Sequence, residues 1–378
     1  MSDRNPSPPP DDEKCVEFED RIGSTSFSQK FVLTVLLDVL KENEKESNQE
    51  KDIEELQEDL EQSLCQLWDM SINKEVAEFL FNSDSLEVFT PVIKNTNKPR
   101  LTEILMGILA NMVSVPALKD IVKAKEDNIV ELTLSVLNCR DTAALVETTR
   151  LLASILENDL WSPIWEQKFL ALDSWDDLTF ILTSTTNEQL LLQCAQCVDI
   201  LLDDQFNPVF RELLLSEPPK SMNFLLESLE EAGKQKNIQI LTYLFHLLQN
   251  LTTCRKGATA LAMVLNQITI PLVTFIKIVA THEWYQCSEN INFFVNSASI
   301  FSLLSFFSRE VEKTFVADLK IAKEVFVIGK YLQNFEVTHQ ENNYFKTALT
   351  ELKRLVEILK TSESSDDYMK NLIHFAFK

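Results

Sequence analysis

The sequence contains very little glycine, with 5 residues among 378. Enzymes of the α/β class bind phosphate groups through glycine-rich loops, which let the backbone approach the phosphates closely. Long helices need no glycine, because a glycine inside a helix costs about 1 kcal/mol relative to alanine. With a hydrophobic content of 45%, this composition predicts an all-α chain that has enough apolar residues for a large core.

Basic residues are also in short supply. The chain has 35 lysines and arginines against 58 aspartates and glutamates, which gives a formal net charge of −23. Nucleic-acid binding requires clustered basic side chains that displace counterions from phosphates, and anionic lipids attract basic segments. We therefore expect no direct contact with nucleic acid and none with a membrane.

Motifs for catalysis and for metal binding are missing. The sequence has no GxSxG, no phosphate-binding glycine loop and no kinase signature, and its four histidines are dispersed. Cys194 and Cys197 have the spacing of a redox or zinc pair, but they lie inside a helical run without a second pair. This predicts two thiols packed in a core, no catalytic residues, no cofactor and no metal.

A secretory signal and a disulfide framework are missing as well. The first residues are polar, and seven cysteines are spread without regular spacing, so we expect a reducing compartment. The least polar window runs from Gly257 to Ala280. Asn266, Gln267 and Pro271 are expected to divide it into two buried core helices, each too short to span a bilayer.

The chain divides into three regions by composition. Residues 1–20 are rich in proline and then acidic, which predicts a disordered tail. Residues 21–62 are expected to form one helix, capped by Ser26 or Ser28 and ending at Leu40, followed by an acidic linker. Residues 63–378 carry a continuous helical pattern.

That pattern repeats. An apolar stripe begins at Leu101 and includes Ile104, Leu105, Ile108, Leu109 and Met112. Similar stripes return near Leu145, Leu190 and Ile240, with a weaker copy in residues 296–311. A period of about 40–47 residues is typical of armadillo and HEAT repeats. The predicted fold is an armadillo/HEAT-like right-handed helical solenoid, in which stacked repeats bury a continuous core.

The faces opposite these stripes carry polar residues at corresponding positions. If the helices stack, they present a ladder of groove candidates, namely Glu103, Gly107, Asn111, Glu147, Arg150, Gln193, Gln196, Thr242, His246 and Asn250. One interpretation is a groove for an extended peptide or a partner helix; the other is an ordinary solvated surface. Asn111 faces the groove in the first case. Alternatively, it is buried and bonds a neighbouring loop.

Several stretches resemble one family in the same order. They are DRNPSPPP at Asp3–Pro10, IGST at Ile22–Thr25, CQLWDMS with EVAEFL at Cys65–Leu80, PRLTEILMGILANM at Pro99–Met112 and LVETTRLL at Leu145–Leu152. Together they are similar to the serum amyloid A-like 1 proteins over roughly residues 1–160, beyond which only the helical pattern continues. The chain is also shorter than vertebrate members. The resemblance implies an armadillo-like protein of the nucleus, with the cytoplasm as a second location, that promotes cell proliferation.

We therefore expect a monomeric, non-enzymatic scaffold that binds protein partners of unidentified kind. An acidic adaptor or chaperone for basic nuclear cargo is the alternative, and an enzyme with dispersed catalytic residues is a more remote one. Importin-type grooves carry a tryptophan beside an asparagine in each repeat. Asn111 and Asn250 have no tryptophan at the neighbouring turn, which disfavours the adaptor.

Overall fold

The structure, a computed structural model, describes residues 20–46, 55–203, 208–216, 222–281, 290–306, 319–334 and 342–361. The tail expected over residues 1–20 falls almost wholly outside this part, and so do residues 47–54 of the acidic linker. All regular secondary structure in the described residues is helical. The expected all-α helical solenoid is confirmed.

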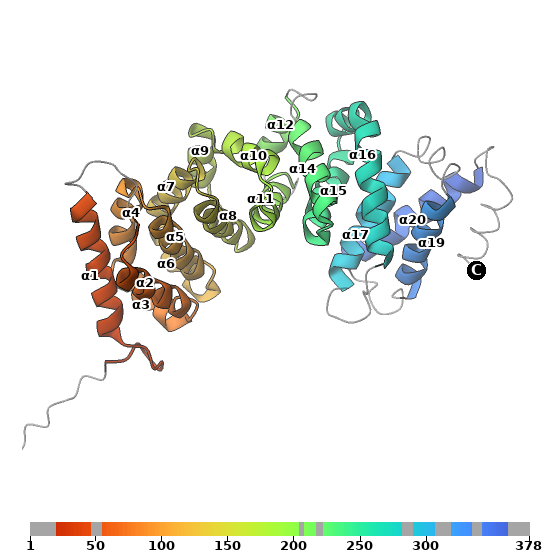
Figure 1. Cartoon of the computed structure of the whole chain (residues 1–378). Helices are drawn as coiled ribbons and strands as arrows, with labels where there is room; N and C mark the ends of the chain where they lie inside the picture. Colours follow the sequence, from red (N-terminus) through yellow and green to blue (C-terminus); the bar gives the residue numbers. More distant parts are fainter. Residues whose placement is uncertain are drawn as a thin grey trace, which may run out of the picture. The chain divides into compact units, whose positions relative to one another are not determined.

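The chain divides into two compact units at Ile121 and Val122, within the range that the sequence pattern joins as one region. Figure 1 shows the helices of the first unit at the red and orange end of the chain. They are α1 (Gln29–Glu46), α2 (Glu58–Met70), α3 (Lys74–Asn82), α4 (Ser85–Asn95), α5 (Pro99–Val113) and the short helix η1 (Pro116–Leu118), with α6 (Lys119–Ala124) at the boundary.

The second unit contains the remaining helices. They are α7 (Glu126–Leu137), α8 (Thr142–Glu157), α9 (Pro163–Ala171), α10 (Ser174–Ser184), α11 (Glu188–Leu201), α12 (Pro208–Leu214), α14 (Asn223–Gln235), α15 (Ile238–Thr252), α16 (Arg255–Thr281), α17 (Asn290–Phe306), α19 (Leu319–Asn334) and α20 (Asn343–Thr361).

Short polar side chains define where several helices begin. The Ser28 hydroxyl accepts a hydrogen bond from the Phe31 amide at 3.0 Å, as expected for the cap of α1. Asn73, Asn187 and Asn237 cap α3, α11 and α15 in the same way. α1 continues six residues past the expected end at Leu40, into the acidic stretch, because the charged residues there are compatible with helix and no glycine or proline stops it.

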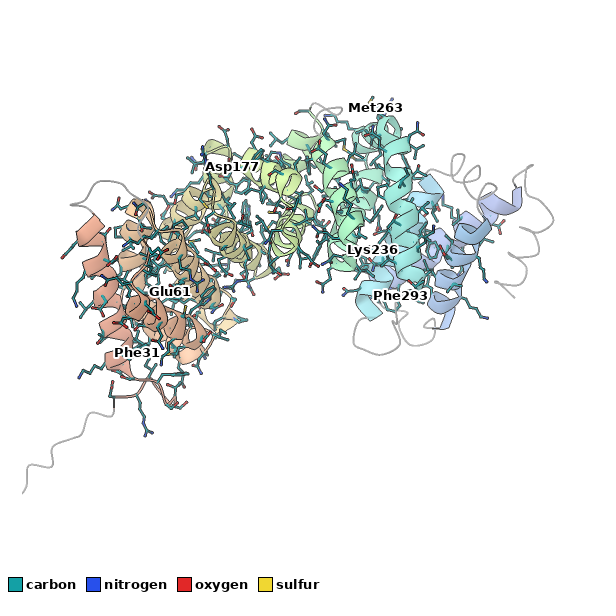
Figure 2. The ribbon with its side chains drawn as sticks, in the orientation of Figure 1. Phe31, Glu61, Asp177, Lys236, Met263 and Phe293 are labelled. Atoms are coloured by element: carbon teal, nitrogen blue, oxygen red, sulfur yellow. The ribbon has the colours of Figure 1, made fainter. Side chains whose placement is uncertain are left out.

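The repeating apolar stripes form the buried faces of α5, α8, α11, α15 and α17. In the second unit α8, α11, α15 and α17 pack in series, each against the next. The stripe residues that were matched by spacing, such as Leu152, Cys197 and Leu247, are at most 1% exposed. Side chains fill the space between successive helices (Figure 2). The helical repeat predicted by periodicity is therefore present.

The expected division of residues 257–280 into two helices is wrong. α16 is continuous over 27 residues, with Pro271 inside it. Proline removes one backbone hydrogen bond and crowds the preceding turn. α16 nevertheless packs against α14, α15, α17 and α19, and it has buried residues both before and after that position. Tertiary packing stabilises the helix through the proline.

Because α16 is continuous, its length has to be compared with that of a membrane-spanning helix. Among the described residues, α16 is long and apolar enough to cross a bilayer, with a mean hydropathy of 1.7 over its most apolar window. Its inward face, which includes Leu261, Ile268 and Phe275, is buried against the neighbouring helices. That burial is what a core helix of a helical stack requires.

Candidate functional site

Gly107 lies in the contact between α5 and α2. A Cβ atom at this position would lie 2.3 Å from ring atoms of Trp68, so the absence of a side chain is what lets the indole lie against the helix. A glycine inside a helix costs about 1 kcal/mol, and a close approach of this kind offsets that cost. The structure attributes it to a neighbouring helix of the same unit.

Asn111 follows one turn after Gly107 and bonds the same segment. It is 8% exposed. Its side-chain nitrogen donates to the Trp68 carbonyl at 3.1 Å and to the Ser71 hydroxyl at 3.0 Å. This geometry matches the second interpretation of Asn111, in which the amide ties the end of α2 to α5.

We expect Asn111→Ala to lower the free energy of unfolding by about 1–3 kcal/mol, because it removes two hydrogen bonds that are each worth about 0.5–1.5 kcal/mol. Replacing the exposed Asn82 in the same unit should change it by less than about 0.5 kcal/mol. A thermal melt compares the two variants. An unchanged melting temperature for Asn111→Ala would contradict this structural role and favour the first interpretation, in which Asn111 faces a binding groove.

Glu103, the third candidate of the first unit, also belongs to the junction of α2 and α5. Arg100 forms ion pairs with Glu103 at 2.8 Å and with Glu61 of α2 at 2.7 Å. These contacts give the quoted motifs a physical meaning. CQLWDMS and PRLTEILMGILANM are the two sides of one helix contact.

The IGST motif has a similar role. Gly23 has a φ of +55°, which favours glycine, and Ser24 donates from its backbone nitrogen to the Glu75 carboxylate at 2.7 Å. The Ser24 hydroxyl donates to the same carboxylate at 2.9 Å. Glu75 belongs to the EVAEFL motif, so these two motifs join the loop before α1 to α3.

The remaining candidates lie in the second unit. Glu147 and Arg150, three residues apart in α8, form an ion pair between the carboxylate and the guanidinium group. Gln193 of α11 is half-buried, and the Asn250 backbone carbonyl of α15 accepts a hydrogen bond from Arg211 of α12 at 2.9 Å. None of these four lines the cavity described next.

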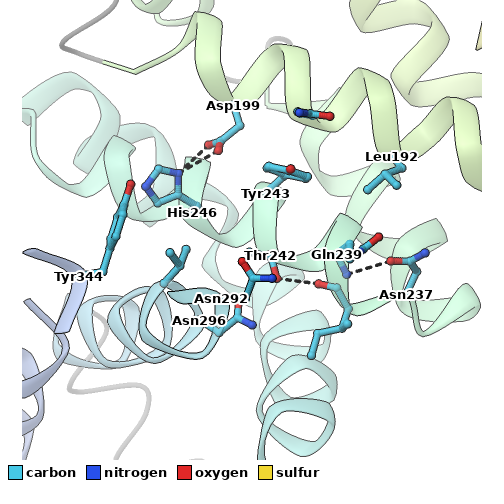
Figure 3. Close-up of a pocket in the computed structure, with 13 residues that line it drawn as sticks. Leu192, Asp199, Asn237, Gln239, Thr242, Tyr243, His246, Asn292, Asn296 and Tyr344 are labelled. Carbon is cyan, nitrogen blue, oxygen red and sulfur yellow. Dashed lines mark hydrogen bonds and ion pairs between the residues drawn. The ribbon is translucent and has the colours of Figure 1, made fainter. Parts of the chain in front are cut away.

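Gln196, Thr242 and His246 are brought together at one cavity of about 590 Å³. We call it the α15 groove. Its walls come from α11, α15, α17 and α20 (Figure 3). It is defined here by Gln196, Asp199, Thr242, His246, Asn296 and Tyr344. Gln196 and Asp199 of α11 lie beside Thr242 and His246 of α15 because these two helices pack against each other.

An ion pair lies at one end of the α15 groove. The Nδ1 atom of His246 is 2.9 Å from both carboxylate oxygens of Asp199, and the ring of Tyr344 meets the imidazole edge to face. Burial disfavours the imidazolium, but the negative charges of Asp199 and Asp203 outweigh it and raise the pKa of His246. Burial also raises the pKa of Asp199, against the opposing effect of His246.

Asn296 lies in the floor of the groove and was not predicted from the sequence. It is 0% exposed. Within the described part of the chain, neither its side-chain oxygen nor its side-chain nitrogen has a hydrogen-bond partner. Such groups are rare in folded proteins. The only sequence signal was its place at the start of the weakest repeat copy.

Four further carboxamides line the groove, namely Gln196, Asn237, Gln239 and Asn292. Asn237 is engaged as the cap of α15 and with Glu188, and the Gln196 nitrogen donates to Glu157. Gln239 and Asn292 therefore join Asn296 as the carboxamides that face a ligand. A carboxamide both donates and accepts, as a peptide unit does. The arrangement is therefore suited to binding a polar chain through hydrogen bonds.

The cysteine pair is part of the core. Cys194 and Cys197 are both 0% exposed on the inner face of α11, and burial raises the pKa of each thiol above its ordinary value. The expectation of two packed thiols is confirmed.

Comparison with known proteins decides the family. A family model described as the SAAL1 C-terminal domain matches residues 175–374. The chain belongs to the SAAL1 family. The matched range contains the α15 groove and extends far beyond residue 160, where the resemblance seen in the sequence ended, so the expected limit of that resemblance is wrong.

Curated relatives agree with this assignment. Protein saal1 of Danio rerio is 32% identical over 271 residues, which cover 68% of this chain and 58% of that protein. Protein SAAL1 of Mus musculus is 31% identical over 212 residues, which cover 53% of this chain and 44% of the relative. The chain thus spans about half the length of the curated relatives it matches.

A designed armadillo repeat protein in complex with the peptide (KR)4 was found among solved structures. It has a TM-score of 0.44 and 11% identity over 71% of this chain. A likeness of this degree carries no argument about function.

Proposed function

We propose that this SAAL1-family protein is a non-enzymatic scaffold that binds a segment of a protein partner in the α15 groove. The observation that carries the proposal is Asn296, a buried amide in the groove floor whose two polar atoms have no partner among the described residues. Leaving such atoms unpaired costs about 1–3 kcal/mol. A peptide unit supplies both the acceptor and the donor that this amide needs.

The groove chemistry favours an extended segment. Carboxamides from α15 and α17 recognise main-chain groups, which every peptide repeats, and Tyr243 and Tyr344 supply apolar surface with a polar end. The cavity is open and lies in one repeat array, as binding surfaces of helical repeats do.

We propose further that the protein acts in the nucleus and promotes cell proliferation, which rests on the family resemblance alone. Since the sequence lacks a basic localisation run, import would depend on a partner.

A pair of threonine variants tests the groove. Thr242 lines it and donates to the Ile238 carbonyl at 2.7 Å, while Thr259 of α16 makes the same contact to Arg255 at 2.9 Å on an exposed surface. Proximity labelling in cells should identify partners with wild-type protein and with Thr259→Arg. We expect Thr242→Arg to lose those partners at least about tenfold, because its side chain fills the groove.

The same experiment separates the alternatives. Equal labelling by both variants would overturn the groove as the binding site. A partner set dominated by basic proteins would favour the acidic adaptor, since Asp199 and Asp203 give this end of the groove negative charge. Fluorescence microscopy of the protein fused to a fluorescent protein tests the nuclear proposal separately. Exclusion of the fusion from the nucleus would overturn that proposal.

A further inference from the structure

The outer face of α1 carries a stripe of exposed leucines. Leu33, Leu37 and Leu40 are 44%, 56% and 36% exposed. The opposite side of the helix buries Val35 and Val39 and packs against α2 and α4. Figure 1 shows α1 at the margin of the first unit. Three adjacent leucines on one exposed face form a patch of the kind that marks a protein interface.

The spacing of this stripe is that of a coiled-coil seam. With Lys30 before the leucines and Glu44 after them, successive members are three, four, three and four residues apart. This alternation places all five on one side of a helix and suits packing against a second helix. A helix face that only contacts solvent does not require apolar residues at this regular spacing.

The charges at the two ends identify the second helix. About a two-fold axis through Leu37, an antiparallel copy of α1 places Lys30 opposite Glu44 of the other copy and Leu33 within one position of Leu40. Both charged residues are exposed in α1. A parallel pairing would instead bring lysine against lysine and glutamate against glutamate. The stripe is therefore complementary to itself in one orientation, as a two-fold interface requires.

We propose that α1 forms an antiparallel homodimer through Lys30, Leu33, Leu37, Leu40 and Glu44. One helix face is a small interface, so association is weak and concentration-dependent. This departs from the monomer expected from the sequence. It is independent of the α15 groove, and either proposal can fail without the other.

Sedimentation equilibrium of the full chain, from micromolar to near-millimolar concentration, tests the dimer. Wild-type protein should self-associate reversibly. Leu37→Arg should weaken self-association at least about tenfold, because it places two like charges on the axis. Ile72→Arg is the matched control, since Ile72 is 69% exposed in the same unit but lies outside the stripe.

Charge exchange identifies the orientation. Lys30→Glu and Glu44→Lys should each weaken the dimer, and the double variant Lys30→Glu with Glu44→Lys should restore it, because the opposite charges meet again. A wild-type chain that stays monomeric over the whole range would overturn the proposal. So would a dimer that survives Leu37→Arg, or a double variant that is as weak as the single ones.

Discussion

Lys98→Met is expected to destabilise the first unit by about 3–5 kcal/mol, because it leaves a buried carboxylate without its cation. Lys98 precedes α5, and its ammonium group pairs with Glu42 of α1. The two side chains are 5% and 3% exposed. Chemical unfolding followed by circular dichroism measures the loss as a lower midpoint.

Two further variants show whether the buried charge is the cause. Lys98→Met combined with Glu42→Leu removes both charges, so it should recover most of the loss. Lys41→Met breaks the pair with Asp38 on the surface of α1, where the side chains are 65% and 43% exposed, and should cost at most about 1 kcal/mol. If Lys98→Met unfolded at the same midpoint as Lys41→Met, this account of the ion pair would be wrong.

Gly107→Ala should destabilise the first unit by up to about 2 kcal/mol, although alanine is the better helix former. The helix gains about 1 kcal/mol in propensity. The new Cβ would lie 2.3 Å from Trp68 ring atoms, and displacing a packed, rigid ring costs about 1–3 kcal/mol or more. The thermal melting temperature of the full chain should fall accordingly.

Gly233 provides the matched control. It also lies inside a helix, α14, but a Cβ there would have no neighbour within 4 Å. Gly233→Ala should therefore raise stability by roughly 0.5–1 kcal/mol. In a Trp68→Ala background, Gly107→Ala should lose its cost, because the clashing ring is gone. Equal stabilisation by both glycine substitutions in the wild-type background would falsify the contact.

The ladder of polar residues opposite the apolar stripes shows what a single sequence can and cannot predict. Asn111 and Thr242 both stand opposite an apolar stripe, and their spacing alone gives them the same predicted role. In the structure, α2 covers Asn111 and accepts its hydrogen bonds, whereas Thr242 lines an open groove. Periodicity reports the side of a helix on which a residue lies, and it contains no information about which neighbour covers that side.

Asn296 and α16 show the same limit. Asn296 is a buried residue of α17, which packs against α15 and α20, and no local pattern distinguishes it from an exposed asparagine. Pro271 is a helix breaker by its covalent structure. Its helix nevertheless continues, because contacts with four neighbouring helices stabilise the segment.

The sequence by itself determined the helical class, the repeat and the acidity of this protein, because side-chain periodicity and charge are properties of short stretches and of composition. The family resemblance was also readable from ordered local motifs. Only the tertiary structure decided that those motifs join α2 to α5 and the α1 loop to α3, and that three ladder residues share a groove with Asn296. Those outcomes depend on contacts between residues about 40–50 positions apart, which are set by the packing of whole helices.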